Sequence, residues 1–191
     1  MDNSLIKGKI VSMAKQEVIK STVLTKALGV VIFIIFTALG AYIYLPLPFT
    51  PVPITLQSFF VILSGAILGP GAGFLSQLGY LSLGVVGLPV FSAGRAGILH
   101  LFGPTGGYLW GFLFSAWLVG KLVYRKRRNC FFLFSSFVIG IFTIYLFGII
   151  QLSLFLKGDF FRAFSLGALP FIFPDLLKIL LATWGYSSLK K

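Results

Sequence analysis

The sequence predicts an all-α membrane protein, a bundle of six transmembrane helices, on three observations. Of its 191 residues, 58% are hydrophobic and only 10% are charged, whereas soluble domains are about 25% charged. The apolar residues form long runs, and a chain of this length holds about six spans of roughly 20 residues each. Basic residues gather at the ends of those runs, as they do at the cytoplasmic ends of membrane spans.

The charge pattern divides the chain into three parts: a basic arm (1–24), a transmembrane domain (25–186) and a basic tail (187–191). The arm mixes lysines with apolar residues and is expected to lie at the membrane surface. Six spans place both termini in the cytoplasm. Twelve of the 16 basic residues then fall on the cytoplasmic side, which is the distribution that sets this orientation.

Prolines and glycines mark the connections in the first half of the transmembrane domain. We expect the first span at Thr25–Leu45, followed by Pro46–Pro53, where four prolines in eight positions predict a stiff outer loop. The second and third spans are expected at Ile54–Leu68 and Phe74–Val86, with a tight turn at Gly69–Gly73 between them.

The segment Gly87–Gly107 holds six glycines and two prolines among apolar side chains, so we expect a packed, lid-like outer segment. The Gly/Pro-rich outer loops together are expected to cover a ligand pocket. The remaining spans are expected at Tyr108–Tyr124, Cys130–Leu156 and Leu166–Tyr186. Glycines four residues apart, such as Gly65 and Gly69, predict close packing between spans.

Asp175 and Lys178 are the candidate site, because they put two ionisable side chains into the otherwise apolar last span. A charged side chain near the bilayer centre costs roughly 2.5–3.5 kcal/mol on insertion scales. Their spacing of three residues leaves both on one face of a helix. Two interpretations stay open: a structural ion pair between helices, or the polar end of a buried site for a small ligand.

Pro170 and Pro174 precede this pair and are expected to bend the span beside a cavity. The aromatic residues Phe171, Phe173 and Trp184 would then line the pocket. Its ligand would combine a hydrogen-bond donor and acceptor with an apolar body. Arg95, in the glycine-rich outer segment, is either an exposed loop residue or a donor to a ligand oxygen.

Four motifs resemble the BioY family, the biotin-binding S components of energy-coupling factor (ECF) transporters. They are LPLPFTPVPITLQ from Leu45, GLPVF from Gly87, GPTGGYLWGF from Gly103 and FPDLLK from Phe173. The resemblance implies a six-helix bundle that captures biotin from outside. Uptake would be powered by a separate module, formed by one transmembrane scaffold subunit and two ATPase subunits.

The resemblance also implies the ligand-binding residues. Asp175 and Lys178 match the acidic and basic residues that contact biotin in the family, and Arg95 corresponds to the family arginine of the outer loop. Phe91 and Tyr108, which lie in two of the motifs, complete the predicted ligand-binding set.

Other functions are disfavoured by what the sequence lacks. There is no GxxxxGK[ST] loop for ATP, and no nucleophile and base at a spacing that suits catalysis. We expect no cofactor, no metal site and no nucleic-acid partner; the single Cys130 and single His100 are assigned to packing or to an interface. The protein is expected to be a multi-pass cell-membrane protein whose direct environment is the lipid bilayer.

One alternative remains: a self-sufficient facilitator or proton-coupled carrier of a related small carboxylate. The family's first span tends to carry an Ala-x-x-x-Ala patch that docks on the scaffold subunit. This chain has only scattered small residues there, and Tyr42 stands where the family commonly has glutamine. Docking on a scaffold and operation alone are therefore both open. The scattered residues are Ala27, Gly29, Ala38, Gly40 and Ala41.

Overall fold

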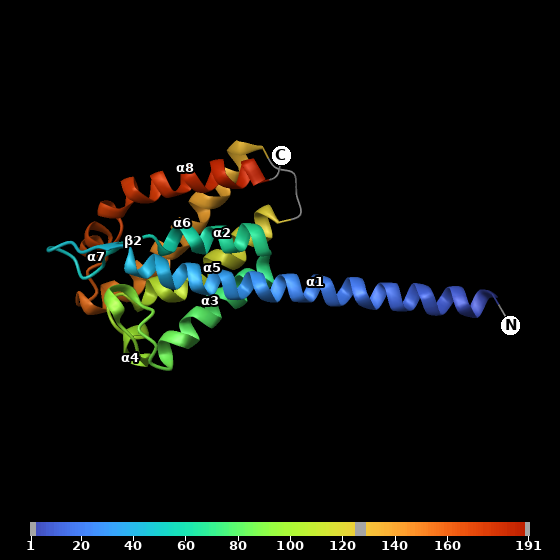
Figure 1. The fold of residues 1–191 in the computed structure, drawn as a ribbon. Helices are drawn as coiled ribbons and strands as arrows, with labels where there is room; N and C mark the ends of the chain where they lie inside the picture. The colour runs from blue at the N-terminus through green and yellow to red at the C-terminus, as the bar shows by residue number, and fades with distance from the viewer. Residues whose placement is uncertain (1–2, 125–128, 190–191) are drawn as a thin grey trace.

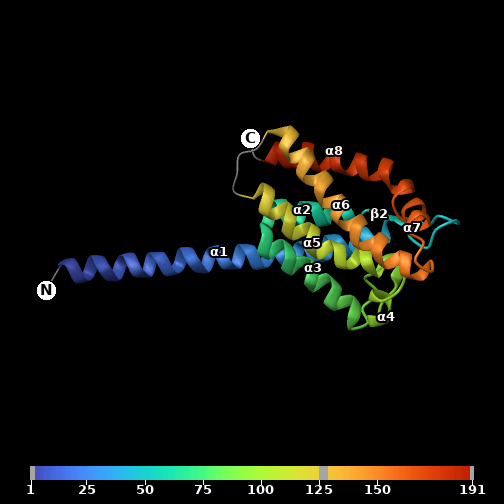
Figure 2. The same cartoon turned by 180° about the vertical axis from the view of Figure 1, so that it is seen from behind.

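The computed structural model describes residues 3–124 and 129–189, with side chains from Val23 onward. The basic run at 125–128 and the two ends of the chain, 1–2 and 190–191, lie outside the described residues. Six longer helices pack side by side, and the N-terminal half of α1 extends beyond them (Figures 1 and 2). These helices are α1 (Asn3–Tyr42), α2 (Gln57–Leu68), α3 (Pro70–Val85), α5 (Gly106–Val123), α6 (Cys130–Phe155) and α8 (Ile172–Leu189).

The fold is that of a multi-pass membrane protein, as predicted. Four segments of the described chain are long and apolar enough to cross a membrane: Val23–Tyr42, Gly106–Val123, Cys130–Phe155 and Phe160–Leu189. The other two long helices are shorter: α2 has 12 residues and α3 has 16. At about 1.5 Å per residue they fall short of a hydrocarbon core that is about 30 Å thick.

The first two predicted spans extend too far into the proline-rich loop. The first helix ends at Tyr42, and the second begins only at Gln57. Between them, β1 (Tyr44–Leu45) and β2 (Ile54–Thr55) form an antiparallel ribbon in which Leu45 faces Ile54. The physical reason is local, since Leu45 precedes a proline, which disfavours helical backbone and leaves it extended.

The first helix is also longer at its other end than predicted. The expected basic arm and the expected span are one continuous helix from Asn3 to Tyr42. The third helix likewise begins earlier than predicted, because a single residue makes the turn before it. Gly69 has a φ of 89°, a backbone conformation that glycine adopts without strain, and Pro70 occupies the first turn of α3.

The last predicted span is divided in the structure. Leu166 belongs to a short helix, α7 (Phe160–Gly167), which is followed by the 3-10 turn η2 (Leu169–Phe171), and α8 begins at Ile172. Pro170 lies within the 3-10 turn and Pro174 in the first turn of α8, where the missing proline N–H leaves no intrahelical bond unmade. Asp175 and Lys178 therefore lie in the first two turns of α8.

Glycines permit the close helix packing that their spacing predicts. A Cβ atom at Gly65 of α2 would lie 2.2 Å from the Ala116 carbonyl oxygen of α5. On the other side of α5, a Cβ at Gly107 would lie 2.3 Å from the Phe147 carbonyl oxygen of α6. Both distances are far below van der Waals contact, so α5 can pack between α2 and α6 only because these positions lack a side chain.

We expect Gly65→Ala to lower the thermal unfolding midpoint of the detergent-purified protein. The added methyl group meets backbone atoms, which cannot move aside as a flexible side chain can, and overpacking of this kind costs about 1–3 kcal/mol. The control is Gly71→Ala, because a Cβ there meets no atom within 4 Å. Both variants replace a helical glycine with alanine, so equal midpoints would contradict the packing argument.

Candidate functional site

A cavity of about 260 Å³ lies at the end of the bundle where the two outer loops meet the helices. This volume is close to the lower end of the roughly 300–1,000 Å³ typical of small-molecule pockets. Its walls come from the loop between β1 and β2, from the segment around Arg95, and from α2, α5, α6 and α8. The apolar part of the wall includes Leu47, Val52, Leu109, Phe112, Ile144 and Phe171.

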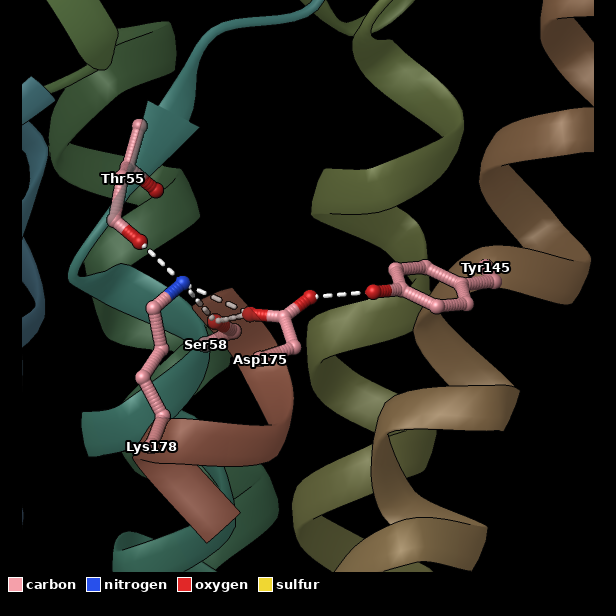
Figure 3. A network of polar contacts seen from close by, with 5 residues as sticks. All are labelled: Thr55, Ser58, Tyr145, Asp175 and Lys178. Carbon is pink, nitrogen blue, oxygen red and sulfur yellow. Dashed lines mark hydrogen bonds and ion pairs between the residues drawn. The ribbon is translucent and has the colours of Figure 1, made fainter. Parts of the chain in front are cut away.

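Asp175 and Lys178 form a buried ion pair in the wall of this cavity (Figure 3). Lys178 Nζ lies 2.6 Å from Asp175 Oδ1 and also donates to the Thr55 carbonyl oxygen at 2.6 Å. Ser58 Oγ donates to the same carboxylate oxygen at 3.0 Å and accepts from Lys178 Nζ at 3.1 Å. From α6, the Tyr145 hydroxyl donates to Asp175 Oδ2 at 2.5 Å.

In this network all three N–H donors of Lys178 are used, whereas the Asp175 carboxylate can accept one more hydrogen bond. An ammonium group has three N–H donors, and three acceptors surround Lys178 Nζ. An ionised carboxylate has about four acceptor positions, and three donors occupy those of Asp175. Asp175 Oδ2 therefore retains one acceptor position, so a ligand N–H can bind there without breaking a bond of the network.

The predicted residue Arg95 lies in the wall of the same cavity, on the outer loop. It is exposed and follows the 3-10 turn η1 (Ser92–Gly94), where the Phe91 N–H donates to the Arg95 carbonyl oxygen at 3.0 Å. His100, in the short helix α4 (Ile98–Leu101), joins it in the wall. Burial lowers the pKa of His100 below its ordinary value, and the positive charge of Arg95 lowers it further.

The other two predicted ligand-binding residues have different positions. Tyr108 lines the cavity, and its hydroxyl donates to the Gly167 carbonyl oxygen at 2.8 Å. Phe91 is fully buried and is not part of the wall. Its ring stacks on His100 at 5.1 Å and meets Tyr80 edge-on at 5.7 Å, so Phe91 supports the wall from behind.

The aromatic lining predicted from the last span is wrong for two of its three residues. Phe171 is buried and lines the cavity, whereas Phe173 and Trp184 are 71% and 72% exposed. The reason is the helical period, since the face of α8 that carries Asp175 turns inward and leaves Phe173 and Trp184 on the opposite face. In a membrane protein this outward face meets lipid or a partner.

Several residues of the site are not predicted from the sequence. Thr55 contributes only its carbonyl oxygen, to which any residue type is equivalent, and Tyr145 lies in an apolar run that gives no sign of its role. Ser58 directly follows the first motif. Gln57, which ends that motif, lines the cavity and donates to the Tyr80 hydroxyl at 2.5 Å. His100, which the sequence assigns to packing or to an interface, stacks on the Phe91 ring and also lies in the cavity wall.

Hydrogen bonds tie both outer loops to the bundle. In the proline-rich loop, the Thr50 hydroxyl donates to the Leu166 carbonyl oxygen of α7 at 2.8 Å. In the glycine-rich segment, the Pro89 carbonyl oxygen accepts from the Tyr42 hydroxyl at the end of α1. These hydrogen bonds hold both loops in a defined position at one end of the cavity.

A bundle of membrane helices around a small cavity, with a buried ion pair in its wall and two loops at one end, defines a membrane-embedded binding protein for a small molecule. The chain belongs to the BioY family, which it matches over residues 12–191. The family resemblance predicted from the four motifs is thereby confirmed.

The chain is similar in sequence to two relatives along most of their length. The chain is 43% identical over 160 residues to the biotin transporter BioY of Thermotoga maritima, which covers 82% of this chain and 92% of that protein. It is 44% identical over 149 residues to the probable biotin transporter BioY of Pyrococcus horikoshii, covering 78% of this chain and 86% of that protein.

The fold has a solved counterpart, a crystal structure at 2.1 Å of the S-component for biotin from an ECF-type ABC transporter. The two structures superpose with a TM-score of 0.77 at 30% sequence identity, over 92% of this chain and 93% of the other. The two proteins therefore share a fold over most of the chain.

Proposed function

We propose that this protein is the substrate-capture subunit for biotin uptake across the cell membrane. The observation that carries the proposal is the Asp175–Lys178 network in the wall of the cavity, with one acceptor position left on Asp175. Biotin has a ureido group with two N–H donors and a carbonyl acceptor, a sulfur-containing ring and a carboxylate tail. A cavity with mixed polar and apolar walls complements that combination, and the named relatives are biotin transporters.

Four of the predicted residues are proposed to contact biotin: Asp175, Lys178, Arg95 and Tyr108. All four line the cavity. Phe91, which lies behind the wall, is proposed to act through His100, whose ring it stacks on. Tyr145 and Ser58 are positioning residues, because each holds an oxygen of the Asp175 carboxylate by a hydrogen bond.

The membrane arrangement is proposed to be six helices with both termini in the cytoplasm, in which α2 and α3 complete the bundle. A basic arm (1–24) would precede the transmembrane domain (25–186), and a basic tail (187–191) would follow it. Two observations support this orientation. The beginning of α1 and the end of α8 lie at the end of the bundle away from the outer loops (Figure 1), and most basic residues are near these ends.

Energy for uptake is proposed to come from a separate module, a transmembrane scaffold subunit with two ATPase subunits, because the sequence lacks an ATP-binding loop of the GxxxxGK[ST] type. The solved relative comes from a transporter of the ECF type. This protein would contribute recognition of the substrate and no ATP hydrolysis.

A second candidate, a facilitator that works without the ATPase module, is favoured by the first helix. Two of its small residues pack inside the chain: a Cβ at Gly40 would lie 3.0 Å from the Phe60 ring, and Ala41 is fully buried. The outward face of α1 carries bulky residues instead, such as Leu28, Ile32 and Leu39. A small-residue docking patch is therefore not formed by Gly40 and Ala41.

The test is equilibrium binding of biotin to the detergent-purified protein, measured by calorimetry. We expect saturable binding, and an absence of binding would contradict the proposed function. Reconstitution into liposomes without any ATPase then separates the two candidates. The facilitator exchanges labelled biotin across the bilayer with saturable kinetics, whereas the capture subunit binds biotin but leaves the internal label unchanged.

A further inference from the structure

A second hollow in the molecule is an apolar groove of about 600 Å³ between α5 and α6, which we call the α5–α6 groove. Its size falls within the roughly 300–1,000 Å³ that is typical of small-molecule sites. It is separate from the cavity described above, because the two are lined by different residues. Five aromatic side chains make up most of its wall: Phe102, Trp110, Phe114, Phe147 and Phe155.

The groove lies in the part of the bundle near the outer loops. Phe114 is eight residues after the start of α5, and Phe147 is eight residues before the end of α6. The rings of these two residues stack with their centroids 4.7 Å apart. At about 1.5 Å per residue, the groove therefore extends about 12 Å along the two helices. In the proposed membrane arrangement it faces the outer half of a hydrocarbon core that is about 30 Å thick.

The groove cannot close by a small movement of its two helices. A Cβ atom at Gly107, which also lines the groove, would lie 2.3 Å from the Phe147 carbonyl oxygen, so the two backbones are already in contact there. Water is unfavourable in the groove, because an apolar wall gives it few hydrogen-bond partners. In a membrane the groove is therefore filled by an apolar group, and lipid acyl chains are the apolar groups that surround the protein.

Gln151 brings a hydrogen-bond acceptor into this apolar wall. Its Nε2 donates to the carbonyl oxygens of Leu101 at 2.9 Å and Gly103 at 2.6 Å. Because both partners are acceptors, the amide N–H₂ has to face them, and Oε1 is left without a donor among the described residues. The 26 residues of α6 span about 39 Å, about 9 Å more than the hydrocarbon core, so Gln151 near the outer end lies close to the level of the lipid headgroups.

The chain that follows the groove carries positive charge. Lys157 comes two residues after Phe155, and Arg162 lies in the first turn of α7; both side chains are exposed. Neither forms a salt bridge to a described residue. The carboxylate between them in sequence, Asp159, accepts from the backbone N–H of Arg162 instead. The outer end of the groove therefore complements an anionic headgroup.

We propose that the α5–α6 groove binds one acyl chain of an anionic phospholipid whose headgroup bears a hydroxyl, for which phosphatidylglycerol is the probe. Lys157 contacts the phosphate, and Gln151 Oε1 accepts a hydrogen bond from the headgroup hydroxyl. The aromatic wall packs on the acyl chain. The site needs the proposed membrane arrangement but no property of the cavity, so it goes beyond the capture of biotin.

The fluorescence of Trp110 provides a local measurement of lipid in the groove. The other two tryptophans, Trp117 and Trp184, are 42% and 72% exposed outside the groove and are replaced by phenylalanine. This Trp110-only protein, otherwise the full chain, is reconstituted into phosphatidylcholine vesicles. Bromine atoms on an acyl chain quench an indole ring that they contact. Brominated phosphatidylglycerol should quench Trp110 along a curve that saturates at a low mole fraction, whereas brominated phosphatidylcholine should quench it only in proportion to its mole fraction.

The matched control keeps Trp184 as the only tryptophan, with Trp110→Phe and Trp117→Phe. Trp184 lies on the outward face of α8 and meets bulk lipid in the proposed arrangement. Both brominated lipids should therefore quench this control in proportion to their mole fraction.

A substitution that fills the groove tests where the lipid binds. In the Trp110-only protein, Ile150→Phe places a larger side chain in the groove and should abolish the saturating phase. Ile139→Phe makes the same change at an exposed position of α6 outside the groove and should preserve that phase. Thermal midpoints establish that the variants are folded. If Ile150→Phe is not, Leu154→Phe takes its place, because Leu154 also lines the groove.

A second substitution tests the headgroup contact. Lys157→Gln should raise the half-saturating mole fraction of phosphatidylglycerol about fivefold, as the loss of one cation beside an anionic lipid implies. The control is Lys121→Gln, in the last turn of α5 at the opposite end of the bundle, which should leave the curve unchanged.

Three results would overturn the lipid site. They are equal quenching of Trp110 by the two brominated lipids, a saturating phase that survives when the groove is filled, and an unchanged curve in Lys157→Gln. The first would show that the groove takes whichever lipid is nearby. All three leave the proposed capture of biotin standing, because the groove and the cavity are lined by different residues. Failure to bind biotin would likewise leave a saturating lipid curve unexplained by anything but the groove.

Discussion

Asp175→Asn is expected to weaken biotin binding by about tenfold to a hundredfold or more, the largest effect on affinity among the variants considered. The change keeps the shape of the side chain but replaces a charged acceptor by a neutral amide. A hydrogen bond to a charged group contributes about 1.5–3 kcal/mol. In addition, Tyr145, Ser58 and Lys178 all donate hydrogen bonds to the Asp175 carboxylate. The new amide N–H₂ of asparagine is itself a donor and must face at least one of these donors. Calorimetric titration with biotin measures the effect.

The matched control for this variant is Tyr145→Phe. It removes the single donor to Asp175 Oδ2 and leaves the carboxylate, Ser58 and Lys178 in place. Because Tyr145 acts through Asp175, its loss should reduce biotin affinity by less than the loss of the carboxylate does. Unchanged affinity in Asp175→Asn would show that the buried pair is structural only.

The class of the fold could be predicted because hydropathy and charge act over whole segments. Four of the long apolar runs form helical segments long enough to cross a membrane. The predicted fourth and fifth spans agree with α5 and α6 to within two residues at each end. The helix ends beside prolines could not be placed as well. There the local backbone preference competes with hydropathy, as at Leu45, which is apolar but extended.

The site was partly predictable for a related reason. Charged side chains in an apolar membrane span cost free energy and are therefore rare, so the sequence alone points to Asp175 and Lys178 as candidate site residues. Their partners Ser58 and Tyr145 are ordinary residues of membrane helices, and they become significant only where α2 and α6 meet α8. The prediction that Phe173 and Trp184 line the cavity is wrong because the sequence shows only that aromatic residues lie near the pair. Which face of α8 they occupy depends on where that helix begins.

Lys178→Met, alone and combined with Asp175→Asn, should separate the two interpretations of the pair. The single variant leaves the buried Asp175 carboxylate without its countercharge, and removal of one partner from a buried ion pair costs about 3–5 kcal/mol. We therefore expect a clear fall in the thermal unfolding midpoint. The double variant removes both charges, and neutral replacements of a buried pair are often tolerated, so the midpoint should recover toward that of the wild type.

Binding should not recover with the midpoint. If Asp175 and Lys178 belong to the biotin site, the stable double variant still lacks the charged acceptor and the cation that fixes it. Its biotin affinity then stays at least about tenfold below that of the wild type. A pair that only joined α8 to α2 would behave differently, because a variant with restored stability would also regain its affinity. The contrast between recovered stability and lost binding therefore assigns the pair to the ligand, since a purely structural role moves both quantities together.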